Sequence, residues 1–117
     1  MAQAKPTRPV DPEQRLERII SVIRSLREGE VVTYGEIAHD AGFAKQSRLV
    51  GHILAITDDD LPWWRVVNST GRLVPGHEQE QIALLQAEDV RCDRGRVTVA
   101  RYGRFSRAPP RPPRLKR

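Results

Sequence analysis

Residues 33–56 read TYGEIAHDAGFAKQSRLVGHILAI, and this segment determines how the chain is expected to fold. Thr33 and Glu36 have the spacing of a capping box, in which each side chain bonds the other residue's backbone N–H at the start of a helix. Gly42 supplies a stop, and a second helix is predicted over about 45–56. Two short helices joined by a turn that contains glycine form a helix-turn-helix pattern. Many helical hairpins share this pattern, so it does not identify a class of protein by itself.

A longer helix is predicted before this segment. Asp11 can cap it, and Pro12 suits the first helical position. Its apolar residues recur at helical spacing, at Leu16, Ile19, Ile20, Ile23 and Leu26. Gly29 supplies a plausible stop. In the second helix of the hairpin, four apolar side chains are expected to face inward, namely Leu49, Val50, Ile53 and Ile56.

The elements after the helical hairpin are shorter. Residues 62–67 are compact, apolar and partly extended, and 68–71 have the composition of a turn. A helix is predicted over 78–87. Residues 90–92 and 96–100 are expected to pair as a short β-hairpin. The predicted fold class is therefore mainly α, with a short β-hairpin near the C-terminus.

Length and charge define the predicted organisation of the chain. Its 117 residues suggest one domain. We expect 1–10 to be disordered, 11–105 to form the domain, and 106–117 to be a flexible tail rich in proline and arginine. Residues 101–117 hold seven of the 20 basic residues and no acidic one, which leaves 13 basic against 15 acidic residues in the rest. The net charge of +5 therefore comes from this C-terminal stretch. The basic tail within it either adds a salt-sensitive attraction to DNA or simply aids solubility.

The remaining composition excludes several classes of protein. Cys92 is the single cysteine, so no intramolecular disulfide can form, which fits a reducing compartment. No apolar run has membrane-spanning length and no signal-peptide core is present, so we expect no membrane association and a cytoplasmic location, on the nucleoid if the cell is bacterial. We expect a monomer without a cofactor. The three histidines form no metal-binding pattern: His39, His52 and His77.

Several motifs occur in the order found in one known family. Residues 32–38 match the first helix of that family's helix-turn-helix, and 47–51 resemble its Ala-Arg-Ala-Val-Gly recognition segment. Residues 62–67 are similar to its active-site motif Pro-Cys-His-Arg-Val, and 68–71 continue the match. Over about 16–90, the chain thus resembles the DNA-binding domain of the O6-alkylguanine-DNA alkyltransferases. The resemblance implies a winged helix-turn-helix-like alkyltransferase C-terminal domain.

Two substitutions in the active-site motif change what the resemblance implies. Trp63 stands at the position of the nucleophilic cysteine, and Trp64 stands at that of its activating histidine. An indole is neither a nucleophile nor a useful base. Glu88 aligns near the glutamate that completes the family's relay, but it has no catalytic role without the other two. The chain therefore resembles an alkyltransferase-like protein, which implies binding of O6-alkylguanine in double-stranded DNA by minor-groove docking and nucleotide flipping, followed by signalling to nucleotide excision repair proteins.

The resemblance also implies a set of DNA-binding residues. Arg48 would fill the space left by the flipped nucleotide, although most helix arginines are simply solvated. Tyr34 would contact the phosphate of that nucleotide, or would be a half-buried core residue. Gly51 would allow close approach of DNA, or would serve helix packing. Phosphate contacts are implied, with plain surface polarity as the alternative, for Lys45, Gln46, Ser47 and Ser69.

Three residues are assigned to the lesion pocket. Trp63 would line it, with core packing as the alternative. Arg65 is expected to bond neighbouring backbone and shape the site, and Asn68 to support the same loop. We expect Trp64 to be structural.

Two other functions remain open on the sequence. The first is a residual alkyltransferase that uses another nucleophile, for which Cys92 is the only thiol. The second is a helix-turn-helix transcriptional regulator, which would read base edges in the major groove, usually as a dimer. The sequence shows no dimerisation heptads.

Overall fold

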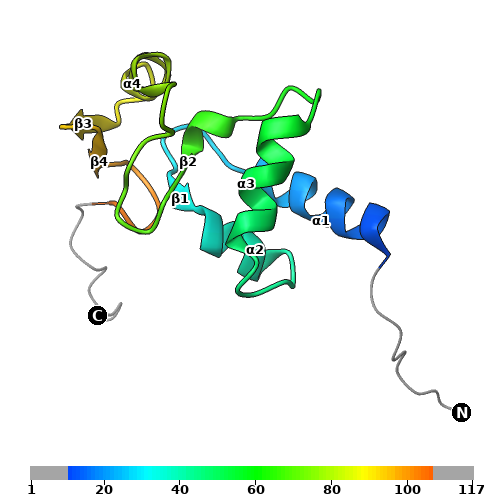
Figure 1. Ribbon diagram of the computed structural model, residues 1–117. Coiled ribbons are helices and arrows are strands. Elements are labelled where there is room, and N and C mark those ends of the chain that lie inside the picture. The colour runs from blue at the N-terminus through cyan, green and yellow to red at the C-terminus, as the bar shows by residue number, and fades with distance from the viewer. Residues whose placement is uncertain (1–10, 107–117) are drawn as a thin grey trace, which may run out of the picture.

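The computed structural model describes residues 11–106, and the predictions for 1–10 and 107–117 lie outside the described residues (Figure 1). The mainly helical fold with small sheets is confirmed. In chain order the elements are α1 (Pro12–Arg24), β1 (Val32–Thr33), α2 (Tyr34–Asp40), α3 (Ser47–Ile56), the 3₁₀ helix η1 (Trp63–Arg65), β2 (Val66–Val67), α4 (Glu78–Gln86), β3 (Arg91–Asp93) and β4 (Arg96–Val99). Figure 1 shows α1, α2 and α3 grouped on one side of β1 and β2, with α4 and the β3–β4 hairpin on the other.

Helix α1 begins as predicted and ends earlier than predicted. The Asp11 carboxylate accepts a hydrogen bond from the backbone N–H of Glu13 (3.0 Å). The helix ends at Arg24, and Ser25 caps it: its N–H and its hydroxyl both donate to carbonyl oxygens of the last turn. Gly29, the predicted stop, instead occupies the following turn with a φ of 85°.

The helix-turn-helix is built on the predicted capping box. The Thr33 hydroxyl accepts from Glu36 N (3.1 Å), and the Glu36 carboxylate accepts from Thr33 N (2.9 Å). Gly42 leaves the first helix with a φ of 94°. The second helix, α3, begins at Ser47 and not at residue 45, because Lys45 has a left-handed φ of 72° and cannot belong to the helix.

The larger of two hydrophobic clusters lies beneath α1, α2 and α3. Its buried residues include Ile19, Ile23, Ile37, Val50 and Ile53. Leu49 packs against this cluster but is only partly buried. The prediction that Ile56 faces inward is wrong, because its side chain lies in the last turn of α3 and is 61% exposed.

Strand β2 connects this cluster to the second one. It pairs in parallel with β1, with Val66 opposite Val32 and Val67 opposite Thr33. Successive strand residues point to opposite faces. Val66 accordingly joins the helical cluster and Val67 joins the second, which also contains Val31, Leu73, Leu85, Val90, Val97 and Ala100. The segment Trp63–Arg65 therefore enters the fold where the two clusters meet.

The elements after β2 follow the prediction closely. Helix α4 covers Glu78–Gln86, against a predicted 78–87, and β3 pairs antiparallel with β4 as the expected hairpin. Between residues 11 and 106, no helix has the length and apolar character needed to cross a membrane.

Candidate nucleic-acid interface

A cavity of about 390 Å³ opens beside α3. This volume lies in the range of roughly 300–1,000 Å³ that is usual for small-molecule sites. Its walls come from α2, α3, η1, the loop before α4 and the first turn of α4, through Tyr34, Gly51, Leu54, Ala55, Trp63, Val74, His77 and Glu80. A larger hollow of about 650 Å³ runs along α1, and its lining holds three carboxylates, Glu13, Glu17 and Asp59, with Arg24. The cavity beside α3 has one carboxylate, Glu80, and therefore suits a polyanion such as DNA better.

Gly51 and Tyr34 form one side of the cavity. A Cβ atom at Gly51 would lie 3.9 Å from Cε1 of Tyr34, an ordinary contact distance, so the space beside Gly51 is open but narrow. Tyr34 is partly buried, and this burial raises the pKa of its phenol. The hydroxyl therefore stays neutral at pH 7 and can donate a hydrogen bond.

Trp63 also lines the cavity. Its ring meets the ring of Trp64 edge to face, with centroids 6.2 Å apart and planes at 88°. It also contacts His77, at a centroid distance of 6.0 Å and an angle of 68°. Trp63 thus contacts two other rings, and its unreactive indole forms part of the cavity wall.

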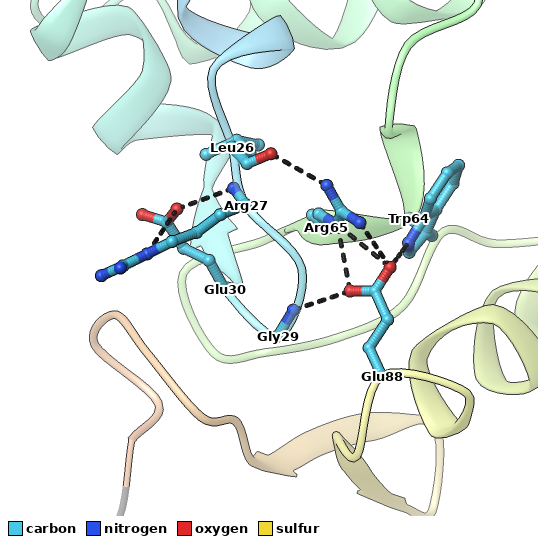
Figure 2. A network of polar contacts seen from close by, with 7 residues as sticks. All are labelled: Leu26, Arg27, Gly29, Glu30, Trp64, Arg65 and Glu88. Carbon is cyan, nitrogen blue, oxygen red and sulfur yellow. Dashed lines mark hydrogen bonds and ion pairs between the residues drawn. The ribbon is translucent and has the colours of Figure 1, made fainter.

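A buried polar network centred on Glu88 supports this arrangement (Figure 2). Its carboxylate accepts from Nε1 of Trp64 (2.8 Å), Nη2 of Arg65 (2.6 Å) and the backbone N–H of Gly29 (2.9 Å). Arg65 also donates from Nη1 to the carbonyl of Leu26 (2.8 Å). The network ties η1 to the end of α4 and to the turn after α1.

The charge of Glu88 is stabilised in this site. Burial alone would raise its pKa, but hydrogen bonds from Arg65, Gly29 and Trp64, together with the charge of Arg65, lower the pKa below its ordinary value. The side chains of Arg65 and Glu88 are only 14% and 7% exposed. Trp64 is structural here, because its indole N–H holds the carboxylate in place.

Arg65 and Asn68, which were grouped with Trp63 in the predicted lesion pocket, do not line this cavity. Both support its surroundings instead. Arg65 bonds backbone as expected, and Oδ1 of Asn68 accepts from the N–H groups of Thr70 (3.0 Å) and Arg72 (2.8 Å), which fixes the turn.

Gln81 is a supporting residue that the sequence analysis missed. It is fully buried on α4. Its amide donates to the carbonyl oxygens of Trp64 (3.1 Å) and Val66 (3.3 Å), and its oxygen accepts from Val74 N (2.7 Å). Gln81 therefore joins η1 and β2 to the segment that holds Val74, which lines the cavity. Its place four residues before the apolar Leu85, on the same helix face, is the signal that could have revealed it.

The residues predicted to contact DNA lie around α3 and one turn. Arg48 is exposed in the first turn of α3, and forms no ion pair with any carboxylate of residues 11–106. Lys45 and Gln46 are exposed in the turn before it, Ser47 begins the helix, and Ser69 is exposed in the turn after β2. Gly51 follows within α3, and it and Tyr34 are the two predicted DNA contacts that border the cavity.

The fold and this site define a helix-turn-helix domain whose second helix borders a cavity walled by tryptophan. Residues 14–90 match the family "6-O-methylguanine DNA methyltransferase, DNA binding domain", and the chain belongs to this family.

Individual relatives agree with this assignment. A DNA base-flipping protein of Vibrio parahaemolyticus is 36% identical over 95 residues, which cover 77% of this chain and 95% of the relative. A DNA base-flipping protein of Escherichia coli is 32% identical over 91 residues, covering 74% and 70% of the two chains. The crystal structure of S. pombe Atl1 in complex with damaged DNA containing O6-carboxymethylguanine superposes with a TM-score of 0.65 at 28% identity, over 70% of this chain and 82% of that one.

Proposed function

We propose that this protein recognises O6-alkylguanine in double-stranded DNA without repairing it. In this proposal α3 docks in the minor groove, the damaged nucleotide rotates into the cavity beside Trp63, and Arg48 fills the space left in the duplex. The observation that carries the proposal is the cavity itself. It lies beside α3 and is lined by Trp63, which the resemblance assigns to the position of the family's nucleophile.

The chemistry of the cavity suits an alkylated purine. Flipping a nucleotide costs a few kcal/mol, and the cost is lower for a damaged base whose pairing is already weakened. Stacking of a base on an aromatic side chain returns about 1–3 kcal/mol. Trp63 offers such a face, and Leu54 and Val74 add apolar surface for an alkyl group. The neutral phenol of Tyr34 can bond the phosphate of the rotated nucleotide.

The same geometry supports a non-enzymatic role. Trp63 and Trp64 cannot accept an alkyl group or activate a thiol. Cys92 lies on β3 and packs against the second hydrophobic cluster, and it is not one of the residues that line the cavity. Burial raises the pKa of the Cys92 thiol, which disfavours the reactive thiolate.

A bound but unrepaired lesion requires a second system to remove it. The proposal therefore includes a partner class: nucleotide excision repair proteins that act on the occupied complex. The family resemblance supports this step.

Tryptophan fluorescence during titration with two matched duplexes tests the proposal. One duplex contains a single O6-methylguanine and the other contains guanine. We expect tighter binding and a larger change in emission with the damaged duplex, and an unchanged protein mass afterwards. Trp63→Phe serves as a control that keeps an aromatic face while it removes one emitter. Equal affinities and equal spectral changes for the two duplexes would contradict the proposal.

A further inference from the structure

Two exposed arginines on neighbouring strands stand directly opposite each other near the cavity. Arg72 and Arg96 form an antiparallel bridge. Two backbone hydrogen bonds flank this pair, from Leu73 to Gly95 (2.9 Å) and from Val97 to Gly71 (2.8 Å). This pattern marks a non-hydrogen-bonded pair, the type in which facing side chains come closest.

This arrangement is unfavourable for the isolated protein. Like charges directly opposite each other on a sheet are destabilising. Arg96 also has Asp93 of β3 opposite it, on the other side of its own strand. Even so, neither Arg72 nor Arg96 forms an ion pair within residues 11–106. An external anion between the two guanidinium groups would relieve the repulsion.

The hairpin that carries Arg96 is basic as a whole. Residues 91–106 contain five arginines and one aspartate, a net charge of +4, and they lie outside the family match, which ends at residue 90. Residues 11–90 hold eight basic and 14 acidic residues, so residues 91–106 concentrate positive charge within the described part of the chain.

The location of the pair indicates its ligand. The segment that holds Arg72 continues directly into Val74, which lines the cavity. On its other side, the N–H of Arg72 bonds the side chain of Asn68, in the turn that exposes Ser69. A duplex with one nucleotide in the cavity would therefore bring its sugar–phosphate backbone to this edge of the protein.

We propose that Arg72 and Arg96 together bind DNA phosphates beside the flipped nucleotide. This inference rests on the proposed function. The planar fork of a guanidinium bonds phosphate oxygens in a bidentate manner, so two facing arginines form a phosphate clamp. The clamp contacts the backbone alone, so it adds affinity for all DNA and no preference for the lesion.

The salt dependence of binding tests this clamp. Arg72→Gln/Arg96→Gln is compared with wild type on the damaged and the undamaged duplex over a range of salt concentrations. Each lost phosphate contact reduces the slope of log K against log salt by about 0.9, so the double variant should lose about 1.8 on both duplexes. Arg15→Gln/Arg24→Gln, two arginines of α1, removes the same charge and should leave the slope unchanged.

A second variant separates charge from folding. Arg72→Lys/Arg96→Lys keeps both positive charges and should keep the salt slope. The glutamine variant should also unfold at a temperature no lower than wild type, because it removes a repulsive pair.

An unchanged slope in the glutamine variant overturns the clamp, as does an equal fall in the lysine variant or in the α1 control. These outcomes are independent of lesion recognition. If wild type shows no preference for damaged DNA while the slope still falls, the proposed function fails, and Arg72 and Arg96 are phosphate contacts to DNA in general that have no link to a flipped nucleotide.

Discussion

Glu88→Gln removes one charge from the buried network and keeps the shape of the side chain. Glutamine has one acceptor oxygen where the carboxylate has two. An amide nitrogen in place of Oε2 would face the donors of Trp64 and Arg65, which lie 2.8 and 2.6 Å from that oxygen. Arg65, at 14% exposure, would lose its counter-ion. Removing one partner of a buried ion pair costs about 3–5 kcal/mol. We expect the low end, about 3 kcal/mol, because the remaining glutamine oxygen can still accept hydrogen bonds from its neighbours.

Urea unfolding and thermal unfolding at pH 7 measure this loss. For a domain of this size, about 3 kcal/mol corresponds to a fall of roughly 12–24 °C in Tm. Glu30→Gln is a matched control, because Glu30 pairs with Arg27 at 3.9 Å and that arginine is 66% exposed. Such surface pairs contribute about 0–1 kcal/mol. A loss in Glu88→Gln no larger than in the control would refute the reasoning.

The pH dependence of stability follows from the same carboxylate. The pKa of Glu88 is lower in the folded protein than the ordinary value for a glutamate, because Arg65, Gly29 and Trp64 stabilise the carboxylate. Its contribution to the free energy of unfolding is therefore complete above that ordinary value and is lost as the pH falls through the folded pKa. We expect the stability difference between wild type and Glu88→Gln to shrink in acid. A difference that is constant from pH 7 to pH 3 would contradict this.

Three further substitutions probe the cavity and the helix beside it. Gly51→Ala should raise the free energy of unfolding by about 0.5–1 kcal/mol, since glycine weakens a helix, and unfolding curves measure this. It should also weaken binding of damaged DNA, because the added methyl group narrows the cavity. Unchanged binding in the titration would show that the cavity does not receive the damaged base. Arg48→Ala should reduce affinity for the damaged duplex more than for the intact one in the same titration, whereas equal losses would make Arg48 a plain electrostatic contact. Trp63→Cys should not accept alkyl groups efficiently, because Trp64, whose indole N–H is bonded to Glu88, cannot activate the new thiol as a base. Stoichiometric labelling of this variant by labelled methylguanine DNA would show the prediction to be wrong.

The features that the sequence predicts well are governed by neighbouring residues. Asp11 caps α1, and Thr33 with Glu36 begins α2, because each cap is closed within a few residues of chain. The β3–β4 hairpin is local in the same sense. Trp63, by contrast, was placed by resemblance, and the structure then locates it in a cavity wall with Tyr34 and Gly51.

The features that the sequence does not predict depend on long-range contacts or on backbone conformation. Glu88 meets Trp64 and Arg65 only after α4 packs against η1. Lys45 takes a left-handed φ that few lysines adopt, so the start of α3 could not be located. Ile56 continues the apolar pattern of α3 beyond the edge of the core, and periodicity alone cannot show where a core ends.

A crystal structure of the protein bound to a duplex with one O6-methylguanine tests the central claim most directly. We predict that the purine lies outside the base stack, against the indole of Trp63, with the Arg48 side chain inside the duplex. A damaged base that stays stacked and paired, with the cavity beside α3 containing no part of the DNA, would contradict the account.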